Sequence, residues 1–310
     1  MKYQDLLLAH GAFYKHEPRA KFYDEYLRKK NDQDWFSPNL PDEEIEKLFQ
    51  FIKRWDFHFR GDEGKFKENY SQIHNHILEL NDESFYTIDL SLQKNVSNIT
   101  KVFNCMASCN YEGRHESTDA SKIIHTINPQ LFVMWDRKIR KGVMGGENIQ
   151  YADYYIIFLQ RMKDELRELI SSCIENSEYS EEESLKIIEE LCDRKTIAKL
   201  LDEYNYMTYT LPNEFSAYKE DIHPDILEKL IHQPLKQSIE IWKKQLYSDR
   251  YSKQGQLRYF NSLLTEAKNR ELISAEEWRG YSSKWRKNPN DRDYLVSFFE
   301  EKLIPDDNSK

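Results

Sequence analysis

The chain has 310 residues, of which 39% are hydrophobic and 32% are charged, and its formal net charge at pH 7 is −9. A chain of this length buries a substantial core and forms one large domain or two modest ones. The acidic total excludes a uniformly basic nucleic-acid-binding protein, so contact with a polyanion requires a locally basic face.

Few residues that favour turns are present, because the chain contains only 9 glycines and 9 prolines. Together with many Leu, Ile, Glu and Lys residues, this composition predicts an all-α protein with long helices and short connections. Free thiols, the absence of an N-terminal signal segment and the lack of an apolar run long enough to cross a bilayer predict a cytoplasmic protein that does not enter membranes. The four cysteines lack the paired spacing of a zinc site, so no metal or cofactor is expected: they are Cys105, Cys109, Cys173 and Cys192.

The N-terminal segment, residues 1–40, is rich in Tyr, Phe and charged residues. Asp42 is expected to cap a strongly amphipathic helix, in which apolar residues recur every three or four positions as far as Phe59. Residues 61–64 contain two glycines and are expected to end that helix. Two further helices are predicted over 66–77 and 92–106.

The stretch 117–140 is the most informative part of the chain. It begins with three good N-cap residues, Ser117, Thr118 and Asp119. The helix that starts there is expected to end before Pro129, because the residue preceding a proline disfavours helical geometry.

An apolar run over 131–135 then leads from the core to Asp136, at the start of a second, basic helix. A carboxylate held among apolar residues and flanked by cations suits a reaction that develops positive charge on a substrate bearing phosphates. The cations that follow are Arg137, Lys138, Arg140 and Lys141.

This arrangement resembles the helix-hairpin-helix DNA glycosylases of base-excision repair. In that superfamily a hairpin and a helix hold the DNA backbone, and a short apolar link leads to an invariant aspartate. Residues 135–140 match the second half of the family pattern with the arginine shifted by one position, and the resemblance covers roughly residues 40–210. It implies that Asp136 is the catalytic aspartate. The family hairpin contains glycines and precedes the position of Ala120, where this chain has only Gly113, so a degenerate or replaced hairpin is expected.

The role that the resemblance implies for Asp136 is electrostatic. Cleavage of the bond between sugar and base leaves an oxocarbenium-like sugar, which a carboxylate stabilises, or the carboxylate orients the attacking water. The alternative, a structural N-cap, is compatible with this role because the family aspartate also begins a helix. Some family members carry a lysine at the end of the hairpin that attacks the sugar. Thr118 occupies that place here, so excision by water without strand cleavage is expected, and Lys122 as a Schiff-base nucleophile is the alternative.

Enzymes that act on DNA bases take them out of the duplex, so a base pocket is expected. Its candidate residues are Trp55, His58, His125 and Trp135. The alternative for His125 is a hydrogen-bonded core histidine, and for the aromatic positions around Trp55 it is a buried helix face. The residues expected to contact the DNA backbone are hydroxyls and cations near Asp136: Arg114, Ser117, Thr118, Lys122, Arg137, Lys138, Arg140 and Lys141.

In the C-terminal half, residues 142–146 are expected to form a flexible turn, and the aromatic segment 206–224 is expected to end the family-like core. Helices are predicted over 154–170, 180–191, 194–204, 225–247, 254–271, 274–287 and 291–303. The predicted organisation is an aromatic-rich segment over 1–40, a glycosylase-like helical core over 41–215 and a C-terminal helical domain of unknown role over 225–310.

The sequence therefore predicts an all-α monofunctional DNA glycosylase. It is expected to hydrolyse the N-glycosidic bond of a modified or damaged base in double-stranded DNA and to leave an abasic site. A modified cytosine in phage DNA, as removed by divergent glycosylases of bacterial antiviral defence, is one substrate that the resemblance suggests. Two other classes stay open: a catalytically inert helical protein that binds nucleic acid or a protein partner, and an RNA-directed relative.

Overall fold

The computed structural model consists of helices joined by turns and loops, which confirms the predicted all-α class. Within the described residues no strand is formed, and an isolated bridge pairs Gly61 with Asn110. In that same part of the chain, no helix is both long and apolar enough to cross a bilayer. The structure describes residues 1–30, 35, 37–110, 114–146, 151–175, 179–192, 195–222, 226, 228–229, 233, 235–246, 253–287 and 292–303.

The chain folds into two units that interleave in the sequence, and each is described by itself. The first unit consists of Met1–Phe13, Asp32–Pro41 and Gly61–Arg250, and the second of Tyr14–Asn31, Asp42–Arg60 and Tyr251–Lys310. This division differs from the predicted linear one, because segments of the N-terminal 60 residues belong to the same unit as the C-terminal helices.

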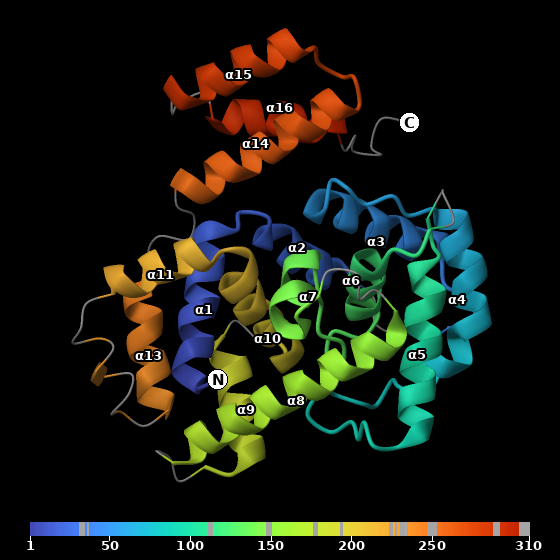
Figure 1. The fold of residues 1–310 in the computed structure, drawn as a ribbon, viewed down its shortest axis with the longest axis vertical. Helices are drawn as coiled ribbons and strands as arrows, with labels where there is room; N and C mark the ends of the chain where they lie inside the picture. The colour runs from blue at the N-terminus through green and yellow to red at the C-terminus, as the bar shows by residue number, and fades with distance from the viewer. Residues whose placement is uncertain are drawn as a thin grey trace. The chain divides into compact units, whose positions relative to one another are not determined.

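Figure 1 draws the helices of both units. Those of the first unit are α1 (Tyr3–His16), whose last turn belongs to the second unit, α4 (Glu63–Leu78), α5 (Gln93–Ala107), α6 (Ser117–Ile127), α7 (Arg137–Met144), α8 (Ala152–Ile174), α9 (Glu181–Leu191), α10 (Ile197–Asn205), the π-helix η2 (Tyr206–Thr210), α11 (Pro212–Asp221) and α13 (Leu235–Leu246). Those of the second unit are α2 (Ala20–Lys29), α3 (Asp42–Trp55), α14 (Lys253–Asn269), α15 (Ala275–Lys287) and α16 (Arg292–Leu303).

The core of the first unit is built around α5, which packs against α4, α6 and α8. The link 131–135 is buried along its whole length, with no residue more than 3% exposed. Its last residue, Trp135, lies in an aromatic cluster, with its ring centroid 5.1 Å from that of Tyr155 and 6.0 Å from that of Phe103. Burial of a large side chain contributes about 1.5–3 kcal/mol of stability, so this packing fixes the point at which Asp136 leaves the core.

Several predicted helix boundaries move in the structure. Residues 61–64, expected to end the helix that begins at Asp42, instead start α4, because Asp62 caps α4 by accepting a hydrogen bond from the backbone N–H of Lys65 at 2.7 Å. Helix α7 runs on through the expected flexible turn to Met144 and ends at Gly145, whose φ of 78° is the left-handed conformation typical of a glycine C-cap. The expected turn over 142–146 is therefore helical at 142–144, and Gly145 and Gly146 lie beyond the end of the helix.

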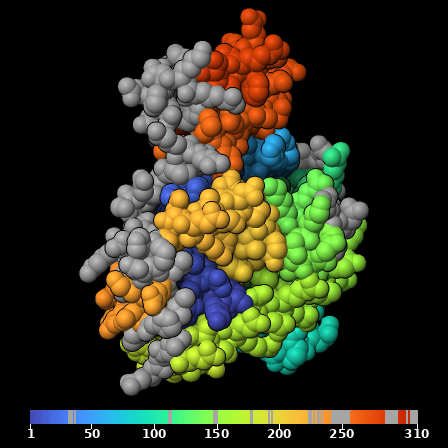
Figure 2. All heavy atoms as spheres, turned by 60° about the vertical axis from the view of Figure 1, so that its left-hand side comes forward, coloured from blue at the N-terminus to red at the C-terminus, as the bar shows by residue number. Residues whose placement is uncertain are grey.

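Two segments are more helical than the sequence pattern indicated. Residues 1–40 contain α1 and α2, and the supposed boundary 206–224 contains η2 and α11. Figure 2 shows η2 and α11 as golden atoms at the surface of the first unit, next to the green atoms of α7. Within this segment, Met207, Phe215 and Tyr218 are buried in helical packing.

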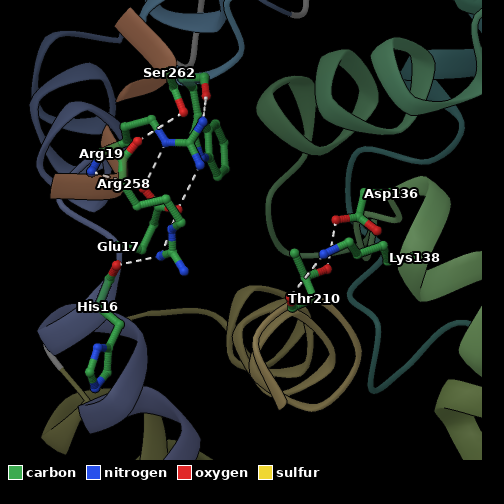
Figure 3. A network of polar contacts seen from close by, with 9 residues as sticks. His16, Glu17, Arg19, Asp136, Lys138, Thr210, Arg258 and Ser262 are labelled. Carbon is green, nitrogen blue, oxygen red and sulfur yellow. Dashed lines mark hydrogen bonds and ion pairs between the residues drawn. The ribbon is translucent and has the colours of Figure 1, made fainter. Parts of the chain in front are cut away.

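In the second unit, α2 packs against α3, and α14 packs against α15 and α16. The rings of Tyr26 and Phe51 stack with their centroids 4.6 Å apart, and Phe260 meets Phe299 edge-on at 6.0 Å. Figure 3 shows the polar contacts at the α1–α2 turn of this unit. Buried Glu17 forms an ion pair with Arg19 at 2.6 Å, while Arg258 donates a hydrogen bond to the His16 carbonyl.

Candidate functional site

Asp136 occupies the N-cap position of α7, with extended backbone angles of −102° and 179°. Its Oδ1 accepts a hydrogen bond from the backbone N–H of Ile139 at 2.8 Å, and its carbonyl oxygen accepts one from the N–H of Arg140 at 2.9 Å. The side chain is half-buried. The carboxylate is thus held at the edge of the core by the first turn of α7, where the helix dipole favours negative charge.

The second carboxylate oxygen is bound by a residue far along the chain. Thr210 Oγ1 donates a hydrogen bond to Asp136 Oδ2 at 2.9 Å across a separation of 74 residues. The ammonium group of Lys138 donates in turn to the carbonyl oxygen of Thr210 at 3.2 Å, so the two contacts run in opposite directions between α7 and η2 (Figure 3). Sequence reasoning missed Thr210, because nothing local to this residue indicates that it meets Asp136.

Helix α7 can approach η2 closely because Gly142 has no side chain. A Cβ atom at Gly142 would lie 2.1 Å from Cδ1 and 2.7 Å from Cγ of Tyr209, and neither distance is sterically possible. The aromatic ring therefore lies directly against the backbone of α7. This contact brings the segment that carries Thr210 against the helix that Asp136 caps.

We expect Gly142→Ala to destabilise the protein, although the same change usually stabilises a helix by up to about 1 kcal/mol. The new methyl group must displace Tyr209, and overpacking of this kind costs about 1–3 kcal/mol. Urea unfolding measures the effect. In a Tyr209→Ala background the same substitution should become neutral or stabilising, and a loss of equal size in both backgrounds would contradict the explanation.

A buried cluster of charged residues lies on α10, the helix that leads into η2. Lys199 Nζ donates to Asp202 Oδ2 at 2.7 Å and lies 3.5 Å from Glu203 Oε1. His10, from α1, places Nδ1 2.5 Å from Glu203 Oε2. Lys199, Glu203 and His10 are at most 1% exposed and Asp202 is 6% exposed, so these charges neutralise one another in the interior rather than in water.

The surroundings shift the pKa values of the two acidic residues of this cluster, Asp202 and Glu203, in opposite directions. Burial raises the pKa of Asp202 to about 6; Lys199 opposes this rise, while Glu203 and Asp136 add to it through like-charge repulsion. Burial also acts to raise the pKa of Glu203, but Lys199 and His10 outweigh it and leave that pKa lowered. Asp136 therefore acts electrostatically on a buried carboxyl group that titrates near neutral pH.

Arg140 is 5% exposed and bonds to the first turn of α6. Its guanidinium donates to Ser117 Oγ at 2.7 Å and to Thr118 Oγ1 at 3.0 Å, and it lies 5.4 Å from the centroid of the Trp135 ring. Burial lowers the pKa of Arg140. Since Ser117 is only 2% exposed, Ser117 and Arg140 join α6 to α7 inside the protein, and their contact with a DNA backbone stays a prediction.

Helix α6 begins at Ser117, within the expected stretch of Ser117, Thr118 and Asp119, but none of these three residues is its N-cap. The N-cap of α6 is Glu116, whose side chain makes no capping hydrogen bond. Ser117 and Thr118 lie inside the first turn, where their hydroxyls are directed to Arg140 instead.

The other residues predicted to contact the DNA backbone are less buried than Ser117 and Arg140. Thr118 and Lys122 are half-buried on α6. Four cations near the ends of α6 and α7 are exposed, and these basic residues are Arg114, Arg137, Lys138 and Lys141. Arg137, Lys138 and Lys141 place positive charge on the helix that Asp136 caps, in a chain whose total charge is negative.

The loop between α5 and α6 is the segment in which a degenerate or replaced hairpin was expected. Gly113, with its neighbours 111–112, lies outside the described residues. Asn110 holds the two ends of the loop together, because its side chain accepts a hydrogen bond from the N–H of Arg114 at 3.0 Å and donates to the carbonyl oxygen of the same residue. Lys65 donates to the Asn110 carbonyl at 2.7 Å, which ties the loop to α4.

The four candidate pocket residues divide between the two units, with His125 and Trp135 in the first and Trp55 and His58 in the second. His125 is fully buried, with Nδ1 2.5 Å from the carbonyl oxygen of Phe132, and Trp135 is buried with Nε1 donating to the Ser117 carbonyl at 3.2 Å. These contacts make both residues part of the core around the α6–α7 link, and their role in a base pocket stays a prediction. Trp55, 9% exposed, and His58, whose side chain is 77% exposed, belong to the second unit, so the structure does not assign them to the unit that holds Asp136.

Among the described residues, no group of three or more His, Cys, Asp or Glu side chains has an arrangement suited to a metal ion. The four cysteines are free thiols. Comparison with protein-family models, with curated proteins and with solved structures found no match to this chain.

Proposed function

We propose that the protein is a monofunctional DNA glycosylase that uses Asp136 to assist hydrolysis of an N-glycosidic bond. The observation that carries the proposal is the placement of this carboxylate. It is half-buried at the N-terminus of α7, and both of its oxygens accept hydrogen bonds from the protein. Exposed cations lie on the same helix. The order of elements, two packed helices joined by a loop and followed by a buried link to an N-cap aspartate, supports the resemblance noted in the sequence.

The proposed reaction develops positive charge on the deoxyribose as the base leaves. A fixed carboxylate stabilises that charge without reorganising, and its free lone pairs are available to orient the attacking water. The exposed cations Arg137, Lys138 and Lys141 would bind the flanking phosphates, so affinity for DNA should fall as the salt concentration rises.

Water is the proposed nucleophile. Thr118, at the position of the family's nucleophilic lysine, is not basic, and its hydroxyl accepts a hydrogen bond from Arg140. The product is therefore an abasic site in an unbroken strand. We infer a modified or damaged base as the substrate, with modified cytosines of phage DNA as one class, which would give the protein a role in antiviral defence.

The test incubates the protein with genomic DNAs that carry different base modifications. Mass spectrometry identifies released bases, and alkali-sensitive nicking detects abasic sites. The proposal expects release of one class of base, no strand cleavage before alkali and no covalent adduct after treatment with borohydride. An adduct that requires Lys122 would establish the Schiff-base alternative. Release of no base from a broad panel would reject the enzyme.

One observation favours a second candidate, a non-catalytic helical protein that binds nucleic acid or a protein partner. Ser117 and Arg140 are buried and bind each other between α6 and α7. The start of α6 therefore has fewer groups available to bind a DNA backbone than the resemblance implies. Binding assays with matched DNA and RNA duplexes separate this candidate from the enzyme and from an RNA-directed relative, because only the enzyme releases bases.

A further inference from the structure

The orientation of the Asp136 carboxylate depends on two elements rather than one. An N-cap hydrogen bond fixes one oxygen, but rotation of a carboxylate about its last side-chain bond is soft, with a broad, two-fold preference. The contact from Ile139 N–H to Oδ1 therefore leaves the plane of the carboxylate weakly defined. The contact from Thr210 Oγ1 to Oδ2 at 2.9 Å fixes the second oxygen, and with it the plane.

We propose that Thr210 is a positioning residue for Asp136, which it orients through its hydroxyl group. The inference rests on the proposed function, because it assigns Thr210 to the reaction that Asp136 would assist. Thr210 acts through the aspartate rather than on the substrate. A charge-assisted hydrogen bond of this kind contributes more than one between neutral groups, so its loss should be measurable.

The π-helical geometry of η2 explains how Thr210 comes to face α7. A π-helix closes its hydrogen bonds over five residues, as the bond from Leu211 N–H to the Tyr206 carbonyl at 3.0 Å does here. The widened turn changes the direction in which the last residue points relative to a continued α-helix. Such turns are frequent at functional sites, and this one ends at the residue that binds Asp136.

Thr210 is also fixed on its backbone side. Lys138 of α7 donates a hydrogen bond to the carbonyl oxygen of Thr210 at 3.2 Å. A side chain of α7 thus binds the backbone of Thr210, while the side chain of Thr210 binds the N-cap residue of α7. Tyr209, the residue before Thr210, lies against Gly142 of α7. The buried ion pairs of α10 stabilise the helix that leads into η2. Contacts on the side chain and on the backbone of Thr210 therefore hold its hydroxyl in place, as precise orientation of a reacting group requires.

The experiment compares Thr210→Val, which keeps the shape and removes the hydroxyl, with Thr210→Ser, which keeps the hydroxyl and removes the methyl group. In single-turnover base release, Thr210→Val should lower the rate by about tenfold with DNA affinity unchanged, whereas Thr210→Ser should stay near the wild-type rate. A wild-type rate for the valine variant, or equal losses in both variants, would overturn the proposal.

A second measurement separates this inference from the proposed function. If the hydroxyl binds Asp136, Thr210→Val should lower the urea midpoint of the wild-type protein more than that of an Asp136→Ala variant, since the partner is already missing there. Equal shifts in the two backgrounds would reject the contact. Absence of base release by the wild-type protein would reject the glycosylase, whereas the unfolding data would still decide whether Thr210 orients Asp136.

Discussion

Asp136→Asn is expected to abolish base release while leaving the fold and DNA binding intact. The substitution removes the negative charge that would stabilise the sugar cation, and general-base or electrostatic assistance by one side chain is worth about 10²–10⁴-fold in rate. The measurement is single-turnover release of the base from the DNA identified in the panel, together with DNA affinity at a fixed salt concentration. Loss of rate without loss of affinity is the expected result.

Asparagine suits this test because it preserves the structural role of the position. Its side-chain oxygen accepts the hydrogen bond from Ile139 N–H as the carboxylate does, and asparagine is as good an N-cap as aspartate. Asp136→Ala, by contrast, removes the cap and should cost about 1 kcal/mol of stability. An asparagine variant that releases bases at the wild-type rate would assign Asp136 to capping alone and favour the non-catalytic candidate.

The local part of the site was predictable from the sequence. A buried apolar link followed by an aspartate and a basic helix is encoded in consecutive residues, and the structure places Asp136 at the N-cap of α7 after that link. The predicted helices over 66–77, 92–106 and 180–191 are likewise confirmed, because their apolar periodicity is strong. Turn signals were less reliable: Gly142 is a packing position inside α7 rather than part of a loop.

The non-local part of the site was not predictable from patterns in one sequence. Thr210 binds Asp136 from 74 residues away, and Glu203 meets His10 from 193 residues away. On α10, the charged residues Lys199, Asp202 and Glu203 have the spacing of a solvated helix face, yet all three are buried. Charge spacing alone does not distinguish a surface ion pair from an interior one, because that difference depends on which other helices cover the face.

Lys199→Met is expected to be the most destabilising of the proposed single substitutions. It removes the cation that pairs with Asp202 at 2.7 Å and Glu203 at 3.5 Å, and leaves two carboxylates in the interior with His10 as the remaining partner in this cluster. Breaking a buried ion pair from one side costs about 3–5 kcal/mol. Urea unfolding at neutral pH measures the loss. The same substitution at exposed Lys186 is the matched control and should change stability by no more than about 0.5 kcal/mol.

The loss of stability caused by Lys199→Met should also depend on pH, and the direction of this dependence follows from the pKa of Asp202. Its pKa is about 6 in the folded protein, above the ordinary value of 3.8, so between these values the folded state binds more protons and stability falls as the pH rises. Lys199 holds that pKa down, and its removal should raise the pKa further and extend this fall to higher pH. The variant should therefore be closer to the wild type at pH 5 than at pH 8, and Asp202→Asn added to Lys199→Met should recover part of the stability at pH 8. The ammonium group of Lys199 also lies 4.4 Å from the centroid of the Phe13 ring. If the loss of stability is independent of pH and Asp202→Asn does not relieve it, Lys199 stabilises the fold through this packing rather than by neutralising buried charge.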